Sequence, residues 1–308
     1  MHRTPSRVVS SSLLALGAAL VASNDCPAQL VIGGFETTRG GALAISGGGA
    51  LQTVRSSISA AFPGVTYTGS ATLTSRYLAT IDILVVFSPT GGNSAISPLT
   101  PAEQASVAAF VQAGGRVLVC ADNDTYAGSG SDAANESVLD PFSIDITGTG
   151  APWAQGASVT NPSASPVTNG PFGQVTNFSV GWSGWFNGVP STAQPIATIN
   201  QSGLPGLLVI PYGASGPGSG AVVAFADSTM FYDGFFTATS NNDVLLRNAI
   251  AYLIQPCVGD LDGSGAVDAA DLAVLLGSWG TAGAADLDAS GTVDAADLGV
   301  LLGNWGPC

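Results

Sequence analysis

The C-terminal fifty residues contain an internal duplication. Residues 259–280 read GDLDGSGAVDAADLAVLLGSWG, and residues 285–306 read ADLDASGTVDAADLGVLLGNWG. Seventeen of the 22 aligned positions are identical at an offset of 26 residues. In each copy an acidic loop precedes apolar residues with the i, i+3, i+4, i+7 spacing of a helix. The repeat predicts a small module with two equivalent halves rather than an acidic, solvated tail.

Each loop has oxygen-bearing residues at the ligand positions 1, 3, 5, 7, 9 and 12 of an EF-hand-type calcium loop. Position 7 donates only its backbone carbonyl, and a glycine at position 6 allows the sharp turn that this loop type requires. The sequence predicts two Ca²⁺ ions. The expected ligands are Asp260, Asp262, Ser264, Ala266, Asp268 and Asp271 in the first loop, and Asp286, Asp288, Ser290, Thr292, Asp294 and Asp297 in the second.

Two features differ from an ordinary EF-hand: position 12 is Asp rather than Glu, and neither loop follows a plausible helix. This arrangement of two copies, each with a loop and an exiting helix, resembles the type I dockerin module. The amino-acid sequence of the repeat also resembles the dockerin-like tails of planctomycete secreted proteins. The resemblance covers residues 257–308. It implies docking onto a cohesin-like or cell-surface partner, often in polysaccharide-degrading complexes. Ala269-Ala270 and Ala295-Ala296 stand where well-known dockerins often carry Ser-Thr, which leaves the partner open.

The apolar stripes of the two expected helices have two interpretations. They could pack on each other as the core of the module, which is favoured for most of these residues because fifty residues can bury little else. Part of the surface could instead face a partner. The stripes comprise Leu272, Leu275, Leu276 and Trp279 in the first copy and Leu298, Leu301, Leu302 and Trp305 in the second. Cys257 and Cys308 bracket the module, and in an exported protein we expect them to form a disulfide that contributes about 4 kcal/mol.

Residues 1–28 have the pattern of a secretory signal peptide. Arg3 and Arg7 precede an uncharged apolar run over residues 8–21, and cleavage is expected after Ser23 or Ala28. The run is shorter than the roughly 20 residues that a membrane-spanning helix needs. The mature chain is therefore expected to be secreted or held at the cell surface and not to span the membrane.

The charge composition excludes several function classes. The formal net charge is −14; all seven basic residues are arginine, and the only histidine is His2. Cleavage after Ala28 removes His2 and leaves a charge of −15. Without His or Lys, the mature chain cannot assemble a Ser-His-Asp triad, a His-ligated zinc site, a Schiff-base lysine or a P-loop. A nucleic-acid partner is not expected, because the chain has no basic patch. Carboxylate chemistry, oxygen-ligated metals and binding remain.

Residues 29–255 alternate strand and helix patterns. The expected strands lie at residues 30–35, 81–87, 116–121, 207–210 and 221–227, and helices are expected around Val54, after the capping box Thr100–Glu103, and around Leu246. This order predicts an α/β domain with a doubly wound, mostly parallel sheet of the flavodoxin or amidotransferase type, followed by a small all-α calcium-binding domain over residues 257–308. Residues 125–205 are expected to form loops with inserted antiparallel strands.

Several sequence segments in this region resemble those of class I glutamine amidotransferase-like proteins. They are GGRVLVCADN, PVTNGPFG, GAVVAFADSTMF and NDVLLRNAIAYL. In active amidotransferases a cysteine on a glycine-flanked turn works with a histidine and a glutamate. Cys120 ends an expected strand, but Leu118 and Asp122 replace the glycines and no histidine can activate it. The resemblance therefore implies a non-catalytic domain, with Cys120 as a packed strand residue.

Three acids and four aromatic residues are further candidates. Asp122 and Asp227 follow expected parallel strands, whose carboxyl ends commonly face ligands, and Asp124 lies nearby. They could hydrolyse a glycoside or hold a metal, although helix capping and turn formation are favoured. The aromatic residues Trp153, Trp182, Trp185 and Phe186 could form a sugar platform, although packing is favoured.

The sequence therefore predicts an exported binding or assembly protein that is attached through its calcium module. The alternative is a polysaccharide-degrading glycoside hydrolase that uses carboxylates such as Asp122 and Asp227.

Overall fold

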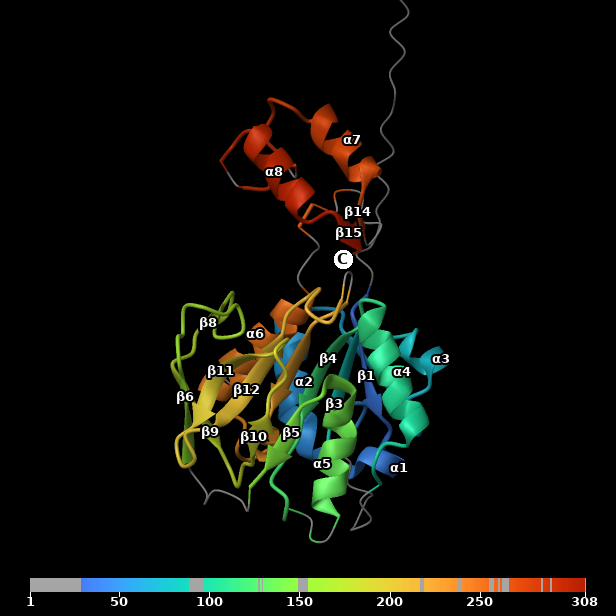
Figure 1. The fold of residues 1–308 in the computed structure, drawn as a ribbon, viewed down its shortest axis with the longest axis vertical. Coiled ribbons are helices and arrows are strands. Elements are labelled where there is room, and N and C mark those ends of the chain that lie inside the picture. Colours follow the sequence, from blue (N-terminus) through green and yellow to red (C-terminus); the bar gives the residue numbers. More distant parts are fainter. Residues whose placement is uncertain are drawn as a thin grey trace, which may run out of the picture.

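The computed structural model describes residues 29–88, 97–126, 128, 130–148, 155–216, 219–237, 240–254, 258–259, 261, 266–283, 285–288 and 290–307. The expected signal peptide lies outside these residues. So do Trp153, the ligand candidates Asp260, Asp262 and Ser264, and the two cysteines Cys257 and Cys308. We refer to residues 29–254 as the α/β part and to residues 258–307 as the C-terminal module (Figure 1).

A nine-stranded sheet forms the centre of the α/β part, in the order β2-β1-β3-β4-β13-β12-β11-β6-β9. The first five strands pair in parallel, and the remaining pairs are antiparallel, so that β12 and β6 alone run against the other seven. The bounds are β1 Val31–Phe35, β2 Thr66–Ser70, β3 Ile83–Phe87, β4 Arg116–Cys120, β6 Gln155–Val159, β9 Asn177–Val180, β11 Gln194–Ile199, β12 Pro205–Ile210 and β13 Val222–Phe225.

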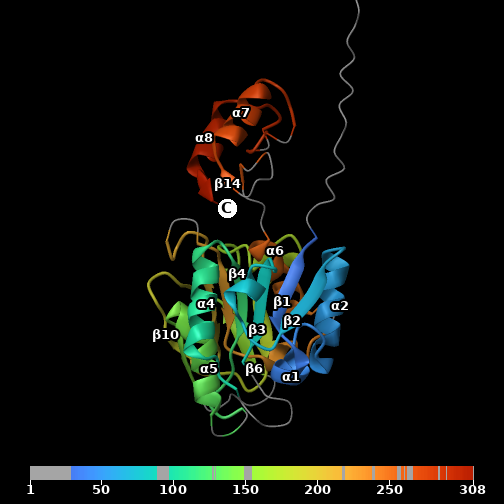
Figure 2. The ribbon, with the colours of Figure 1, turned by 90° about the vertical axis from the view of Figure 1, so that its right-hand side faces the viewer.

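Helices cover both faces of the sheet (Figures 1 and 2). Alternate residues of β4 enter two separate cores: Leu118 and Cys120 pack with α2 and α6, whereas Val117 and Val119 pack with α4 and α5. This period of two is the reason that a fully apolar strand can support two layers of helices. The doubly wound arrangement is confirmed. The helices are α1 Thr37–Gly40, α2 Gln52–Ala61, α3 Ser75–Leu78, α4 Pro101–Gln112, α5 Ser131–Leu139 and α6 Asn241–Leu253.

The capping box at Thr100 is confirmed, with mutual hydrogen bonds between Thr100 and Glu103 at the start of α4. Residues 125–205 contain short antiparallel pairs, as expected, but also the helix α5, which the sequence pattern did not predict. The short pairs are β5 Asp145–Thr147 with β10 Trp185–Gly188, and β7 Asn169–Gly170 with β8 Gly173–Gln174. The 3₁₀ helices are η1 Gly41–Leu43, η2 Gly49–Leu51, η3 Asp140–Phe142 and η4 Thr229–Phe231.

The C-terminal module has two helices, α7 Ala269–Gly277 and α8 Ala295–Gly303, at the 26-residue offset of the repeat. The expectation of an all-α module was wrong, because β14 Ala266–Val267 pairs with β15 Gly306–Pro307. The equivalent pairing recurs in the second half: Val293 N donates to Thr281 O at 2.8 Å, and Gly280 N donates to Val293 O at 2.9 Å. Each loop therefore pairs with the segment that follows the other half's helix.

The apolar stripes of α7 and α8 divide between core and surface. Leu275 and Leu301 are buried and pack with Val267 and Val293. Four residues of the stripes are exposed: Leu276, Trp279, Leu302 and Trp305. Of the helices that the structure describes, none has the length and apolar character to cross a membrane.

Candidate calcium loops and a buried acid pair

The second loop brings three carboxylates together. Oxygen atoms of Asp286, Asp288 and Asp297 all lie within 4.8 Å of one another. Within residues 258–307 no basic side chain is present to balance them, because the last arginine of the sequence is Arg247. Carboxylates at this separation repel unless a cation lies between them.

Backbone amides hold these carboxylates in place. Asp297 Oδ1 accepts hydrogen bonds from Leu287 N at 2.6 Å and Asp288 N at 3.0 Å, and its Oδ2 accepts one from Asp294 N at 2.7 Å. The hydrogen bond from Asp294 N and those from the other amides lower the pKa of Asp297, so that this enclosed side chain stays ionised. The loop thus keeps a charged oxygen donor inside the module.

The other half of the loop uses the turn at Gly291, where φ is 97°. Ser290 N donates to one oxygen of Asp286 and one of Asp288, each at 3.0 Å, and Gly291 N donates to Asp286 at 2.8 Å. Ser290 Oγ lies 3.3 Å from the carbonyl of Thr292. Positions 1, 3, 5, 7 and 12 therefore lie around one turn, and this donor set of hard oxygens fits Ca²⁺.

Asp294, at position 9, does not join the cluster of three carboxylates. Its Oδ1 caps α8 by accepting Ala296 N at 2.8 Å. Position 9 of an EF-hand loop often reaches the ion through a water molecule, which is compatible with this capping role.

The first loop repeats the same hydrogen bonds where it is described. Asp271 accepts Leu261 N at 2.6 Å and Asp268 N at 2.8 Å, and Asp268 accepts Ala270 N at 2.7 Å. Each bond has its equivalent 26 residues later. The predicted ligands Asp260, Asp262 and Ser264 lie outside the described residues, and only the backbone of Ala266 is described.

The α/β part contains a second acidic group, formed by Asp122 and Asp227 at the carboxyl ends of the adjacent strands β4 and β13. Each residue is 1% exposed. Ser228 Oγ donates to Asp122 Oδ2, and Asn123 N donates to Asp122 Oδ1 at 2.8 Å. Asp227 accepts Gly181 N at 2.6 Å and Thr229 N at 2.8 Å. The sequence correctly placed the two acids at one edge of the sheet.

Burial decides the protonation of this group. Desolvation raises the pKa of Asp122 to about 6, against hydrogen bonds from Ser228 and Asn123 that lower it. Desolvation and the nearby Asp122 charge raise the pKa of Asp227 well above its usual range. Burial and the same two acids also raise the pKa of the Cys120 thiol, which is fully buried. The prediction that Cys120 is a packed strand residue is confirmed.

The other candidates have structural partners. Asp227 forms a turn at the start of η4, as expected, whereas Asp122 caps no helix. Asp124 Oδ2 accepts hydrogen bonds from Thr147 Oγ1 and Gly148 N, each at 3.0 Å.

Among the aromatic candidates, packing is confirmed for Trp185, which is partly buried, and for Phe186, which is buried. Trp182 is 49% exposed and so does not belong to the core.

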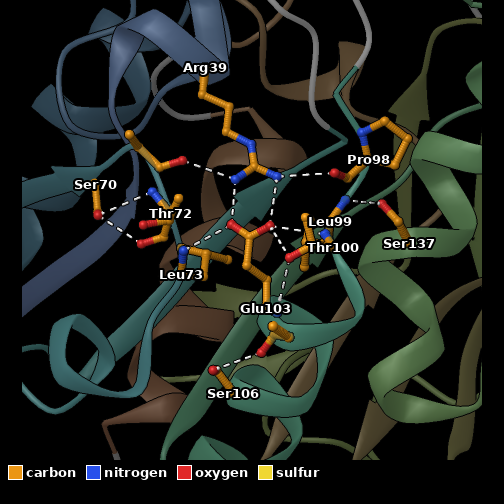
Figure 3. Close-up of polar contacts among 12 residues, drawn as sticks. Arg39, Ser70, Thr72, Leu73, Pro98, Leu99, Thr100, Glu103, Ser106 and Ser137 are labelled. Carbon is orange, nitrogen blue, oxygen red and sulfur yellow. Dashed lines mark hydrogen bonds and ion pairs between the residues drawn. The ribbon is translucent and has the colours of Figure 1, made fainter.

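An ion pair that the sequence did not reveal ties together the segments after β1, β2 and β3 (Figure 3). Arg39 pairs with Glu103 and also donates to Ala71 O at 2.9 Å and Pro98 O at 3.1 Å. Burial would raise the pKa of Glu103, but Arg39 and the amides of Thr100 and Leu73 lower it to about 2. The order β2-β1-β3 places this pair at the switch point of the sheet, where open α/β sheets commonly bind ligands.

Comparison with solved structures supports the fold. The mmIFT52 N-terminal domain is similar with a TM-score of 0.53 and 13% identity, covering 74% of this chain and 98% of that chain. A GMP synthase protein from Thermoplasma acidophilum has a TM-score of 0.44, 12% identity and coverage of 73% and 94%. A ThuA-like protein from Bacteroides uniformis has a TM-score of 0.45, 14% identity and coverage of 75% and 91%.

The α/β part thus shares its fold with the mmIFT52 N-terminal domain, and at 13% identity the likeness is one of fold alone. No protein-family model matches the chain, and no curated protein matches it either.

Proposed function

We propose that this chain is an exported attachment protein whose C-terminal module resembles a type I dockerin and binds two Ca²⁺ ions. The observation that carries the proposal is the convergence of Asp286, Asp288 and Asp297 within 4.8 Å. The repeated hydrogen bonds around Asp271 support an equivalent site in the first loop. The partner is a cohesin-like or cell-surface protein.

Calcium binding and attachment are linked through the helices. Each loop's position-12 aspartate lies in the first turn of α7 or α8, and the exposed side chains Trp279 and Trp305 follow directly after these helices. Without a cation, the repulsion within each loop opposes the helix start, so binding of calcium stabilises the folded module. The paired Leu and Trp side chains then offer apolar contacts to a partner.

The α/β part acts in this proposal as a binding domain without catalysis. A glycoside hydrolase would need two carboxylates that reach a substrate in an open cleft. Asp122 and Asp227 are each 1% exposed, and their oxygens accept hydrogen bonds from neighbouring amides and Ser228. This burial favours binding over the hydrolase alternative.

A capture experiment tests the proposal. Immobilised full-length chain is incubated with solubilised surface proteins of the secreting cell, in millimolar calcium or in chelator. We expect a cohesin-like partner to be retained in calcium only, and to be lost with Asp297→Asn. Asp132→Asn, an exposed acid on α5, is the matched control and should capture normally. Equal capture in chelator, or by Asp297→Asn, would count against calcium-dependent attachment.

A further inference from the structure

Two exposed aromatic residues lie at or next to a cavity in the α/β part. The cavity has a volume of about 430 Å³ and lies between β9, η4 and the start of α6. Phe235 lines it and is 49% exposed. Trp182, also 49% exposed, directly follows the lining residue Gly181. Large aromatic side chains exposed beside a concave site are typical of ligand binding.

The segment that carries Trp182 is fixed by the buried acid pair. Trp182 has the left-handed backbone conformation, with φ at 54°, which is costly for a residue with a bulky side chain. Its carbonyl accepts Asn123 Nδ2 at 2.5 Å, and Asn123 is itself held by Asp122. On the preceding side, Gly181 N donates to Asp227 at 2.6 Å. A strained, exposed tryptophan is therefore supported by two buried carboxyl groups.

The segment that carries Phe235 is fixed in a similar way. Asp233 accepts Thr53 N at 2.8 Å and Gln52 N at 3.2 Å, and so caps the start of α2. Asp233 N also donates to Ala50 O at 2.7 Å. Both aromatic rings are thus presented by backbone segments that the surrounding structure holds, which lowers the entropic cost of binding a ligand.

The lining indicates the chemistry of the ligand. Among the described residues that line the cavity, none has a charged side chain, and the polar side chains are those of Ser179, Thr229 and Asn242. An anion would find no basic partner there. A cation would find no carboxylate among these lining residues, and Asp227, which accepts Gly181 N, is only 1% exposed. A neutral ligand with an apolar face for the rings and hydroxyl groups for the polar rim meets both conditions.

We propose that this cavity binds a neutral saccharide, with a pyranose ring stacked on Phe235 or Trp182 and its hydroxyls directed to Thr229 and Ser179. The proposal rests on the α/β part alone and does not depend on attachment through the C-terminal module. It also assigns the buried acids a positioning role for Trp182 in place of a catalytic one.

Binding to full-length chain in calcium tests this proposal, with neutral hexasaccharides of glucose, mannose, galactose and xylose as probes. Calorimetry should detect at least one of them with a dissociation constant of about 1 mM or lower. Trp182→Ala and Phe235→Ala should each weaken binding about tenfold. Leu204→Ala is the control, since Leu204 is a large apolar side chain of the α/β part that is 40% exposed and does not line the cavity.

A further variant separates binding from folding. Trp182→Gly relieves the left-handed strain, so it should be at least as stable as Trp182→Ala and still lose saccharide binding. Asp297→Asn should retain saccharide binding even where it abolishes attachment. Absence of binding to all four probes, unchanged binding in the Trp182 and Phe235 variants, or displacement of a bound saccharide by tetramethylammonium would overturn the proposal.

Discussion

Asp122 and Asp227 place two carboxyl groups side by side at the ends of β4 and β13, in surroundings that exclude water. The folded chain keeps protons on this pair that an unfolded chain releases near pH 4. The stability that these protons contribute is complete below about pH 4, and it is lost as pH rises through the folded pKa of Asp122, about 6. The pair thus makes the α/β part more stable in mild acid than in mild base.

We therefore expect urea unfolding at saturating calcium to show lower stability at pH 8 than at pH 5. Asp122→Asn should reduce this difference by about 1 kcal/mol, because it removes one of the titrating carboxyls. Burial also raises the pKa of Glu136, to about 7, so Glu136→Gln must be measured in parallel. A pH dependence that Asp122→Asn leaves unchanged would rule out the pair as its source.

The contribution of Glu103 to stability depends on pH in the opposite direction. Its pKa is about 2, so the stability it contributes is present above its usual pKa and is lost only as pH falls towards 2. Glu103→Gln leaves Arg39 without its partner and should cost about 3 kcal/mol at pH 7, measured by thermal unfolding. Glu36→Gln is the control, because Glu36 is partly exposed and accepts a hydrogen bond from Thr38 only among the described side chains. Equal losses in the two variants would contradict the importance of the ion pair.

At the scale of elements, the two halves of the C-terminal module depend on each other. The loop residue Val267 pairs with Gly306, beyond α8, and Val293 pairs with Gly280, beyond α7. Gly280 and Gly306 both have positive φ, at 76° and 136°, so a side chain at either position is strained. In each half, the loop therefore pairs with the segment that follows the helix of the other half, so the two halves are not independent consecutive units.

This pairing between halves predicts that a substitution after the helix of one half weakens calcium binding in the loop of the other half. Gly280→Ala should weaken the second site and Gly306→Ala the first, each by about 1–2 kcal/mol. The amide signals of Gly265 and Gly291, at position 6 of each loop, report the two sites separately during a calcium titration followed by NMR. Weakening of each variant's own preceding loop instead would show that the halves are independent.

Elements with strong local signals could be predicted from the sequence, and those that depend on distant partners could not. The capping box defined the start of α4, and the repeat defined α7 and α8, because these signals lie within a few residues. The pairing of Val267 with Gly306 joins segments that are far apart in the chain, and two-residue strands have no periodicity. Likewise, Asp122 and Asp227 could be placed at one edge, but their burial depends on Ser228 and the segment around Gly181, which no local pattern reveals.

At the scale of the whole molecule, the C-terminal module carries eight aspartates over residues 257–308 and no basic residue. Its core consists of few side chains, led by Val267, Leu275, Val293 and Leu301. So small a core offers little against the repulsion within two acidic loops. Folding of the module should therefore depend on divalent cations, whereas the α/β part, with two large cores, should not.

Calorimetric titration of the chelator-treated, full-length chain with calcium tests this account most directly. We predict two ions bound per chain in wild type, one in Asp297→Asn and one in Asp271→Asn, with a gain of helix on binding. Binding of no calcium by wild type, or an unchanged stoichiometry of two in both variants, would contradict it.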